Sequence, residues 1–458
     1  MAGIAFELRK KLGHKRLSSI LQTFAYSAFL SSGAWIISIL SIMLVSYIVA
    51  GIIKNDKIVA DFQTSVIYLI ALSLILSGSF QFYISRFTAD RIFEKSHKNI
   101  FPNFFTATIL NMLIAFILYL PLSIYLFRSV SPVYTLLSLF SFVVLCGEWV
   151  AVSMLTGLKS YNLIVYSFIA GYAVTVVIAF LFGRLGIDFL MLAFFAGQTV
   201  IFISLIASII YSYPSERLFS LDFLKRKNIN IYVTLILTGL FYNLGLWIDK
   251  FVFWFSPLTG ITVFSHLKAS IVYDAPIFLA YFSMIPGMAV FFLKLEGEFA
   301  GYHAAYYETV TEGKTLEEIY EAGNKMILSA RNVFFDVIRI QAIADILIIL
   351  TNNIIFKFFG ISLVYIPLFR ALLLGTMLLQ ILLVLIGFLF YFDKRNASLF
   401  ISFLFFILNF LFTYISIKLG PYYYGYGYAL SLLVCVVVGS IFMRRFLDEI
   451  HYFTYMYI

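Results

Sequence analysis

The chain has 458 residues, of which 62% are hydrophobic and only 12% charged, and its formal net charge is +9. Soluble domains usually carry roughly a quarter charged residues, so this composition excludes a water-soluble globular protein. The basic residues are dispersed over many connections, which argues against a nucleic-acid partner. We therefore expect the lipid bilayer to be the main environment of the chain.

Apolar runs follow one another along the whole sequence. A helix of about 20 apolar residues crosses a hydrocarbon core of roughly 30 Å, and helices satisfy their backbone hydrogen bonds without water. The sequence therefore predicts an all-α polytopic membrane protein with about twelve transmembrane helices. The expected spans cover residues 20–53, 63–85, 103–127, 133–157, 161–183, 189–213, 231–255, 270–293, 333–356, 364–392, 398–419 and 426–443.

The eighth expected span contains Pro276, Pro286 and Gly287. Proline lacks a backbone amide proton and its ring clashes with the preceding turn, so we expect a kink or an interruption in this helix. Broken helices often line transport paths. A tolerated kink, packed by neighbouring helices, is the simpler interpretation.

Most of the 32 Lys and Arg residues fall in every second connection. Because Lys and Arg in short loops stay cytoplasmic, this alternation predicts an even number of spans with both termini in the cytoplasm. The net positive charge then faces anionic lipid. The connections expected in the cytoplasm lie at 9–16, 86–98, 159, 217–227, 294–331, 394–395 and 444–445.

A charged break, YPSERLFSLDFLKRKN, separates six expected spans from six more. Both groups begin from the cytoplasmic side, as in a transporter built from parallel repeats. FLSSGAWI at 29–36 and FYNLGLWI at 241–248 share Phe, Gly, Trp and Ile at matching positions. We expect an N-terminal six-helix lobe at 1–213, a cytoplasmic linker at 214–230 and a C-terminal six-helix lobe at 231–458.

The longest expected cytoplasmic excursion covers residues 294–331. Aromatic and apolar residues recur there at helical spacing beside several carboxylates, and Thr315 followed by Glu318 indicates a capping box at the start of a second helix. These amphipathic helices either lie along the bilayer surface or dock a cytoplasmic partner.

Ionisable side chains at membrane depth are costly, so each is a candidate for a functional role. Asp336 and Arg339 are three residues apart on one helical face, where they could simply neutralise each other. A polar cavity lined by Glu148, Asp345 and Arg370 would suit a hydrated substrate. The candidate substrate-path residues are Glu148, Asp249, Lys250, Asp274, Asp336, Arg339, Asp345 and Arg370.

Aromatic residues cluster at two expected outer ends, WIDKFVFWF at 247–255 and PYYYGYGY at 421–428. The simpler interpretation is the interfacial belt that Trp and Tyr form at headgroup level. The alternative is a stacking platform for sugar rings, and Trp247 and Trp254 therefore join the candidate substrate path.

No Walker lysine loop, GxSxG elbow, HExxH motif or Rossmann glycine fingerprint occurs in the sequence. The five histidines are scattered, and Cys146 and Cys435 lie in apolar runs without a CxxC partner. We therefore expect no enzymatic activity, no cofactor and no metal site. Transport would use an ion gradient, the gradient of the substrate or the push of a coupled synthase.

MAGIAFELRK at the first residues, LSSGAWIIS in the first expected span and NLGLWIDKFVFW in the seventh resemble the Pel exopolysaccharide transporter family, PelG. The resemblance implies membership in the multidrug/oligosaccharidyl-lipid/polysaccharide exporter superfamily. It also implies two six-helix lobes around a central cavity that opens alternately to the two sides. No catalytic residues come with it, so the candidate path rests on membrane depth alone.

The same resemblance implies a function. The family carries Pel polysaccharide, which is rich in N-acetylgalactosamine, across the cytoplasmic (inner) membrane during formation of the biofilm matrix. The partners it implies are the cytoplasmic glycosyltransferase PelF and the membrane proteins PelD and PelE.

Three other functions compete with this one. A flippase for lipid-linked oligosaccharides would need cavity arginines for a pyrophosphate, for which Arg339 and Arg370 are the candidates. A cation-coupled drug antiporter would use a carboxylate-lined pocket built from Asp249, Asp274 and Asp345. A membrane-embedded glycosyltransferase ranks last, because the expected outer loops are short.

Overall fold

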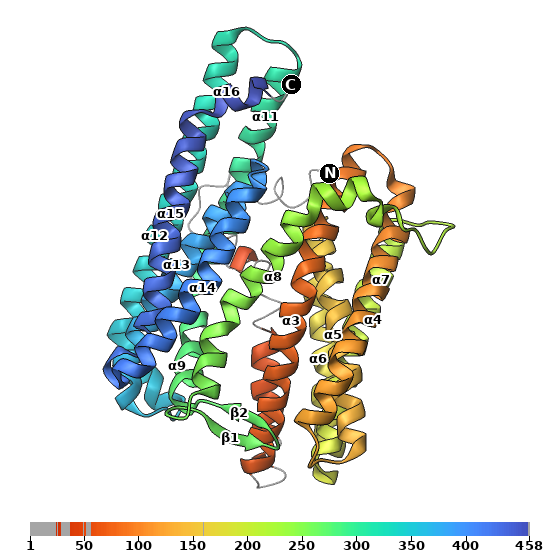
Figure 1. The fold of residues 1–458 in the computed structure, drawn as a ribbon, viewed down its shortest axis with the longest axis vertical. Helices are drawn as coiled ribbons and strands as arrows, with labels where there is room; N and C mark the ends of the chain where they lie inside the picture. Colours follow the sequence, from red (N-terminus) through yellow and green to blue (C-terminus); the bar gives the residue numbers. More distant parts are fainter. Residues whose placement is uncertain are drawn as a thin grey trace. The chain divides into compact units, whose positions relative to one another are not determined.

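The structure is a computed structural model that is 87% helical (Figure 1). It describes residues 24, 26–28, 37–48, 50–51, 56–158 and 160–456. The described residues from 37 to 270 cluster into one compact unit, the first unit, and those from 271 onward into another, the second unit. The basic cluster at 9–16 and the repeat segment at 29–36 lie outside the described residues, as does Lys159.

The first unit consists of long helices and one short hairpin. α3 packs against α5 and α8, α5 packs against α4 and α7, and α6 packs against α7. Its elements are α3 (Asp56–Phe93), η1 (His97–Asn99), α4 (Ile100–Leu126), α5 (Pro132–Gly157), α6 (Tyr161–Phe182), η2 (Gly183–Leu185), α7 (Ile187–Ser212), η3 (Asp222–Leu224), α8 (Arg226–Phe255), β1 (Ile261–Phe264) and β2 (Leu267–Ala269).

Local sequence signals explain where these helices begin and how closely they pack. α5 begins after Ser131, whose hydroxyl accepts a hydrogen bond from the amide of Tyr134 at 3.1 Å, with Pro132 in the first turn. α6 and α7 meet at Gly171 and Gly197. A Cβ added to Gly197 would lie 1.8 Å from Oγ1 of Thr175 and 2.7 Å from the backbone oxygen of Gly171. Small residues allow such close approach between membrane helices.

The second unit contains α9 (Ile271–Phe282), α10 (Met284–Lys294), η4 (Leu295–Phe299, a π-helical turn), α11 (Ala300–Thr311), α12 (Leu316–Phe358), η5 (Leu363–Tyr365), α13 (Ile366–Tyr391), α14 (Arg395–Leu419), η6 (Pro421–Tyr423), α15 (Tyr426–Asp448) and α16 (Ile450–Met456). α13 packs against α9, α12 and α15, and α14 packs against α15. The eighth span was predicted to be kinked or interrupted, and it is interrupted only briefly: Ser283, the one residue between α9 and α10, keeps helical dihedral angles (φ −62°, ψ −24°).

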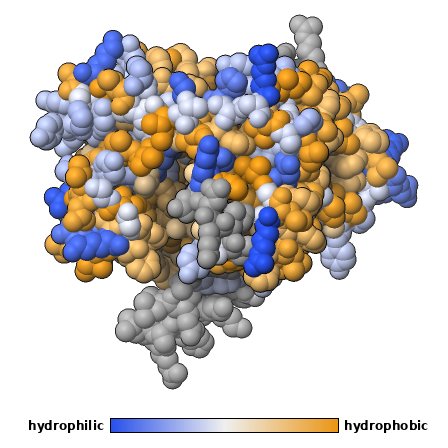
Figure 2. Space-filling model, turned by 90° about the horizontal axis from the view of Figure 1, so that it is seen from below, coloured by the Kyte–Doolittle hydropathy of each residue, from blue (hydrophilic) through white to orange (hydrophobic). Residues whose placement is uncertain are grey.

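The described residues include 10 helices that are long and apolar enough to cross a membrane. Of the other two expected spans, the first lies partly outside the described residues, and the ninth forms part of the long helix α12. The polytopic helical class is therefore confirmed, while the count of about twelve stays a prediction. Apolar side chains are exposed over large parts of the surface, Leu350 at 74% among them, and Figure 2 shows such residues interspersed with hydrophilic ones.

α12 begins with the predicted capping box and continues without interruption into the expected ninth span. The amide of Glu318 donates to Oγ1 of Thr315 at 3.4 Å, and the amide of Thr315 donates to Oε2 of Glu318 at 2.9 Å. With 43 residues, α12 is about 65 Å long at 1.5 Å per residue, roughly twice the thickness of a hydrocarbon core. In Figure 1, α11 and the start of α12 extend beyond the ends of α13 and α14.

Connections expected on the same side of the membrane meet within each unit. At one end of the second unit, the ring of Phe299 lies 5.9 Å from that of Phe392, which lies 4.8 Å from that of Phe446. At the opposite end of the first unit from its hairpin, the imidazole of His97 stacks on Tyr213 at 6.1 Å. These contacts agree with the predicted alternation of the connections.

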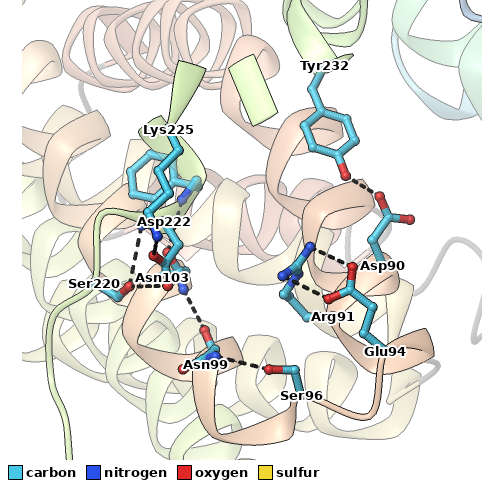
Figure 3. Close-up of polar contacts among 11 residues, drawn as sticks. Asp90, Arg91, Glu94, Ser96, Asn99, Asn103, Ser220, Asp222, Lys225 and Tyr232 are labelled. Atoms are coloured by element: carbon cyan, nitrogen blue, oxygen red, sulfur yellow. Dashed lines mark hydrogen bonds and ion pairs between the residues drawn. The ribbon is translucent and has the colours of Figure 1, made fainter. Parts of the chain in front are cut away.

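The connection that precedes α8, which contains η3, is hydrogen-bonded to α4 (Figure 3). The amide of Phe223 donates to Oδ1 of Asn103 at 3.2 Å, and the ammonium of Lys225 lies 2.6 Å from Oδ1 of Asp222. Hydrogen bonds to Asp222 from Lys225, which contributes most, and from Ser220 and Asn103 hold the pKa of this carboxyl below its usual value. The structural division falls at residue 270, later than the predicted linker at 214–230, because α8 packs along α3. The arrangement of six spans followed by six stays a prediction.

Candidate functional site

A buried carboxyl group without a hydrogen-bond partner lies within the first unit. Glu148, in α5, is 1% exposed, and neither of its carboxylate oxygens has a partner among the described residues. Gln198, in α7, is fully buried, and both polar atoms of its amide are likewise without one. Tyr172, in α6, lies beside both Glu148 and Gln198. We call Glu148, Tyr172 and Gln198 the first-unit polar cluster.

The first-unit polar cluster contains hydrogen-bond donors and acceptors that are buried in the protein interior. Leaving such groups without partners is energetically unfavourable. Burying a polar group without a partner costs free energy, and a buried charge costs far more. Such a carboxyl therefore requires a proton, a cation or a hydrogen-bond donor as its partner. Three helices contribute one side chain each, so the cluster can present both donors and acceptors to one ligand.

A second polar cluster lies at the helix interruption of the second unit. Nε2 of Gln341, in α12, donates to the backbone oxygen of Ser283 at 2.9 Å and to Oδ1 of Asp345 at 2.9 Å. The hydroxyls of Ser283 and Thr376, in α13, are 3.3 Å apart. Gln380 lies one turn further along α13 and is fully buried. We call Ser283, Gln341, Asp345, Thr376 and Gln380 the second-unit polar cluster.

Several polar atoms of the second-unit polar cluster, three oxygens and one amide nitrogen, have no partner among the described residues. Among the described residues, these are Oδ2 of Asp345, Oε1 of Gln341 and both polar atoms of the Gln380 amide. Gly287, in α10, lies beside them, since an added Cβ there would be 2.5 Å from Oε1 of Gln341 and 3.2 Å from Cγ of Gln380. The two glutamines therefore approach the same point on α10.

Asp249 and Lys250 form a buried ion pair in the last turns of α8. The ammonium of Lys250 lies 3.1 Å from Oδ1 of Asp249 and donates to the backbone oxygen of Leu246 at 2.8 Å. It also lies 5.5 Å from the ring of Trp247. This pair neutralises its own charge, so a structural role suffices to explain it.

Asp336 and Arg339 pair as the sequence predicted, with 3.3 Å between Oδ1 and Nη1. The Arg339 side chain is 72% exposed, and Lys294 also lies 3.4 Å from Asp336. Surface ion pairs of this kind contribute little to stability. They mark the end of the span rather than a buried site.

The other charged candidates are dispersed. Arg370, in α13, is exposed, so it does not line the buried second-unit polar cluster that holds Asp345. Asp274, in α9, is half-buried. Glu148 belongs to the first unit. The predicted grouping of Glu148, Asp345 and Arg370 thus stays a prediction.

The aromatic candidates differ in exposure. Trp254 is 2% exposed and stacks on Tyr68 with 4.7 Å between ring centroids, so it is a core residue of the first unit. Trp247 is partly buried. Tyr422, in the 421–428 cluster, is 92% exposed, as an interfacial belt requires.

Sequence reasoning missed the amide and hydroxyl members of both clusters. The candidates were ionisable or aromatic side chains, whereas Gln198, Gln341 and Gln380 supply most of the hydrogen-bonding atoms without a partner. A glutamine inside an otherwise apolar run is the signal that could have found them.

Solved structures with the same fold are transporters of the multidrug and toxin extrusion (MATE) type. A MATE protein crystallised in a bent conformation aligns with a TM-score of 0.66 and 14% identity over 98% of each chain. An outward-facing multidrug resistance MATE transporter of the MOP superfamily aligns at 0.62 and 15% identity over 92% of this chain and 96% of that one. An inward-facing one aligns at 0.56 and 14% identity over 89% and 94%. The fold is thus that of a two-lobed membrane transporter.

The sequence narrows this class further. The sequence model of PelG, described as "Putative exopolysaccharide Exporter (EPS-E)", matches residues 1–455. The chain therefore belongs to the PelG family, which confirms the resemblance. No match was found among curated protein sequences. Family and fold are those of multi-pass membrane transporters rather than of enzymes.

Proposed function

We propose that this chain exports a Pel-like exopolysaccharide, rich in N-acetylgalactosamine, across the cytoplasmic membrane for assembly of a biofilm matrix. The observation that carries the proposal is the match to the PelG family over residues 1–455, on a fold shared with MATE transporters. Both termini lie in the cytoplasm in this proposal, because the basic connections are expected there.

Export would proceed by alternating access. MATE relatives have been solved in outward-facing and inward-facing conformations, and we propose the same pair of states for this chain. The first-unit polar cluster supports a path for a hydroxyl- and acetamido-rich polymer, because Glu148 and Gln198 offer unused acceptors and Gln198 an unused donor. Groups left unpaired in one state are available to a substrate in another.

An export assay in cells tests this function. Deletion of the chain should abolish extracellular polymer, and wild-type chain should restore it. Glu148→Ala and Asp345→Ala should fail to restore export at normal protein abundance, whereas the exposed control Arg339→Ala should restore it. Full export by a strain lacking the chain would contradict the proposal.

We further propose that the projecting hairpin, α11 with the first part of α12, docks a cytoplasmic glycosyltransferase of the PelF kind. Between 300 and 330 it carries more carboxylates than ammonium groups, in contrast to the net charge of the whole chain, and these are Glu308, Glu312, Glu317, Glu318 and Glu321 against Lys314 and Lys325. An anionic bilayer surface repels such a segment, and the length of α12 lets it stand clear of the headgroups. PelD-like and PelE-like membrane proteins would complete the assembly.

Co-purification tests the docking. Replacing residues 300–330 with a flexible linker should release the glycosyltransferase from a tagged chain. Simultaneous Glu317→Lys and Glu321→Lys substitutions should weaken recovery, while Lys418→Glu on the expected outer side serves as the control. Undiminished recovery with the linker variant would refute the docking proposal and leave the export proposal standing.

A further inference from the structure

The second-unit polar cluster combines a helix interruption, one carboxylate and several unused oxygen atoms. Asp345 is 6% exposed, Gln341 and Gln380 are fully buried, and Ser283 is 1% exposed. The cluster belongs entirely to the second unit, so its geometry does not depend on how the two units are arranged. The cation-coupled antiporter considered from the sequence would use carboxylates alone, and it did not include the glutamines or hydroxyls of this cluster.

Hydrogen bonds within the cluster leave some of its oxygens without a protein partner among the described residues. Nε2 of Gln341 is already used, because it donates to Ser283 and to Oδ1 of Asp345. Oε1 of the same amide and Oδ2 of the carboxylate are left over. Gln380 approaches from α13 to the same side of Gly287 as Oε1 of Gln341. A Cβ at position 287 would clash with Oε1 of Gln341, so glycine allows the two glutamine side chains to approach α10 closely.

The charge of the cluster is uncompensated within the protein. Asp345 forms no ion pair with any Lys or Arg in the described part of the chain, and its hydrogen bond comes from a neutral amide. A lone carboxylate in a low-dielectric interior requires a proton or a cation as its partner. Carboxylate, carbonyl and hydroxyl oxygens are the ligands that hard cations prefer.

The donor set favours a single positive charge over a double one. Among the described residues, no group of three or more His, Cys, Asp or Glu side chains is placed to hold a metal ion. Sites for divalent cations in proteins usually supply several carboxylates. One carboxylate with neutral oxygens balances a monovalent ion, and interrupted membrane helices are where such ions bind.

We propose that the second-unit polar cluster binds one alkali cation, Na⁺ or K⁺, through oxygen atoms of Asp345, Gln341 and Gln380. The hydroxyls of Ser283 and Thr376 complete the oxygen lining. Binding is independent of the exported polymer, and only its use as a driving force for export rests on the proposed function.

A thermal unfolding series on the purified full chain tests the site. The midpoint temperature should rise with NaCl or KCl relative to choline chloride at equal ionic strength, because a ligand that binds only the folded state stabilises it. Asp345→Asn should remove the rise, since it deletes the charge at nearly constant size. Gln380→Met should weaken cation affinity by about tenfold or more.

Asp336→Asn is the matched control, because it removes a half-buried carboxylate outside the cluster from the same helix, and it should retain the full rise. If Asp345→Asn does not fold, saturable binding of ²²Na⁺ or ⁸⁶Rb⁺ to the wild-type chain and its loss in Gln380→Met decide the matter. An equal rise with choline, or wild-type cation binding in both variants, would overturn the proposal. A wild-type chain that exports polymer but shows no cation effect would refute the site and leave the export proposal standing.

Discussion

Two buried glutamines in comparable membrane helices predict opposite mutational effects. Gln341→Met replaces an amide that makes 2.9 Å hydrogen bonds to Ser283 and Asp345. Gln198→Met replaces an amide that makes no hydrogen bond of good geometry among the described residues and has only the Tyr172 hydroxyl beside it. Methionine has nearly the same size in both cases, so packing changes little.

The magnitudes follow from what each substitution leaves behind. Side-chain hydrogen bonds inside membrane proteins contribute about 0.6 kcal/mol on average and up to about 1.7, and an orphaned buried acceptor adds about 1–3 kcal/mol. Gln341→Met should therefore destabilise the second unit by about 2–4 kcal/mol. At about 2–4 °C per kcal/mol, its unfolding midpoint should fall by roughly 5–15 °C. Gln198→Met should be neutral or stabilising, because it removes an unpaired buried amide.

The two free cysteines provide the assay. Cys146 is buried in the first unit and Cys435 in the second, so a thiol-reactive fluorophore reports unfolding of one unit at a time in single-cysteine chains. Gln341→Met is measured with Cys146→Ala, and Gln198→Met with Cys435→Ala. An unchanged midpoint for Gln341→Met, or an equal drop for Gln198→Met, would refute the reasoning.

Three further predictions concern the ends and the core of the units. Burial lowers the pKa of His451 below its ordinary 6.5, so the folded state favours the neutral imidazole. The amides of α16 should be fully protected from hydrogen exchange above about pH 6.5 and should lose protection as the pH falls below it. The same loss in His451→Phe would show that this histidine is not the cause. Asn103→Leu should cost about 1–3 kcal/mol by orphaning the buried amide of Phe223 and should speed proteolysis before α8; equal proteolysis rates would contradict this hydrogen bond. Trp254→Ala should lower the free energy of unfolding by about 3–5 kcal/mol, because it truncates a core side chain, whereas Tyr422→Ala should leave the unfolding midpoint unchanged. Equal unfolding midpoints for the two variants would contradict the core position of Trp254.

Hydrophobic runs and local signals predicted the elements well. The apolar runs correspond to long helices, Thr315 and Glu318 form the capping box, and Pro276 and Pro286 flank the interruption at Ser283. Each of these depends on residues close together in the sequence. Helix propensity, capping and proline sterics act over one or two turns, so one dimension suffices to read them.

Features that depend on which helices are neighbours were not predictable. A tryptophan can belong either to the interfacial belt or to the core of a helical unit. Only the stacking of Trp254 on Tyr68 shows that this one lies in the core. The meeting of Gln341 with Ser283 joins residues 58 positions apart. The short hairpin β1–β2 after α8 was also missed, although it is held by a hydrogen bond from the Tyr68 hydroxyl to the Lys268 carbonyl. Such contacts are long-range, and span periodicity carries no information about them.

Transport of polymer by the purified chain is the most direct test of the central claim. Proteoliposomes containing the full chain and its glycosyltransferase would receive a radiolabelled nucleotide sugar on the side where the enzyme sits. The account predicts that labelled polymer enters the lumen and becomes resistant to an added glycoside hydrolase, only when the chain is present. Polymer that remains fully digestible outside the vesicles, with synthesis unimpaired, would contradict it.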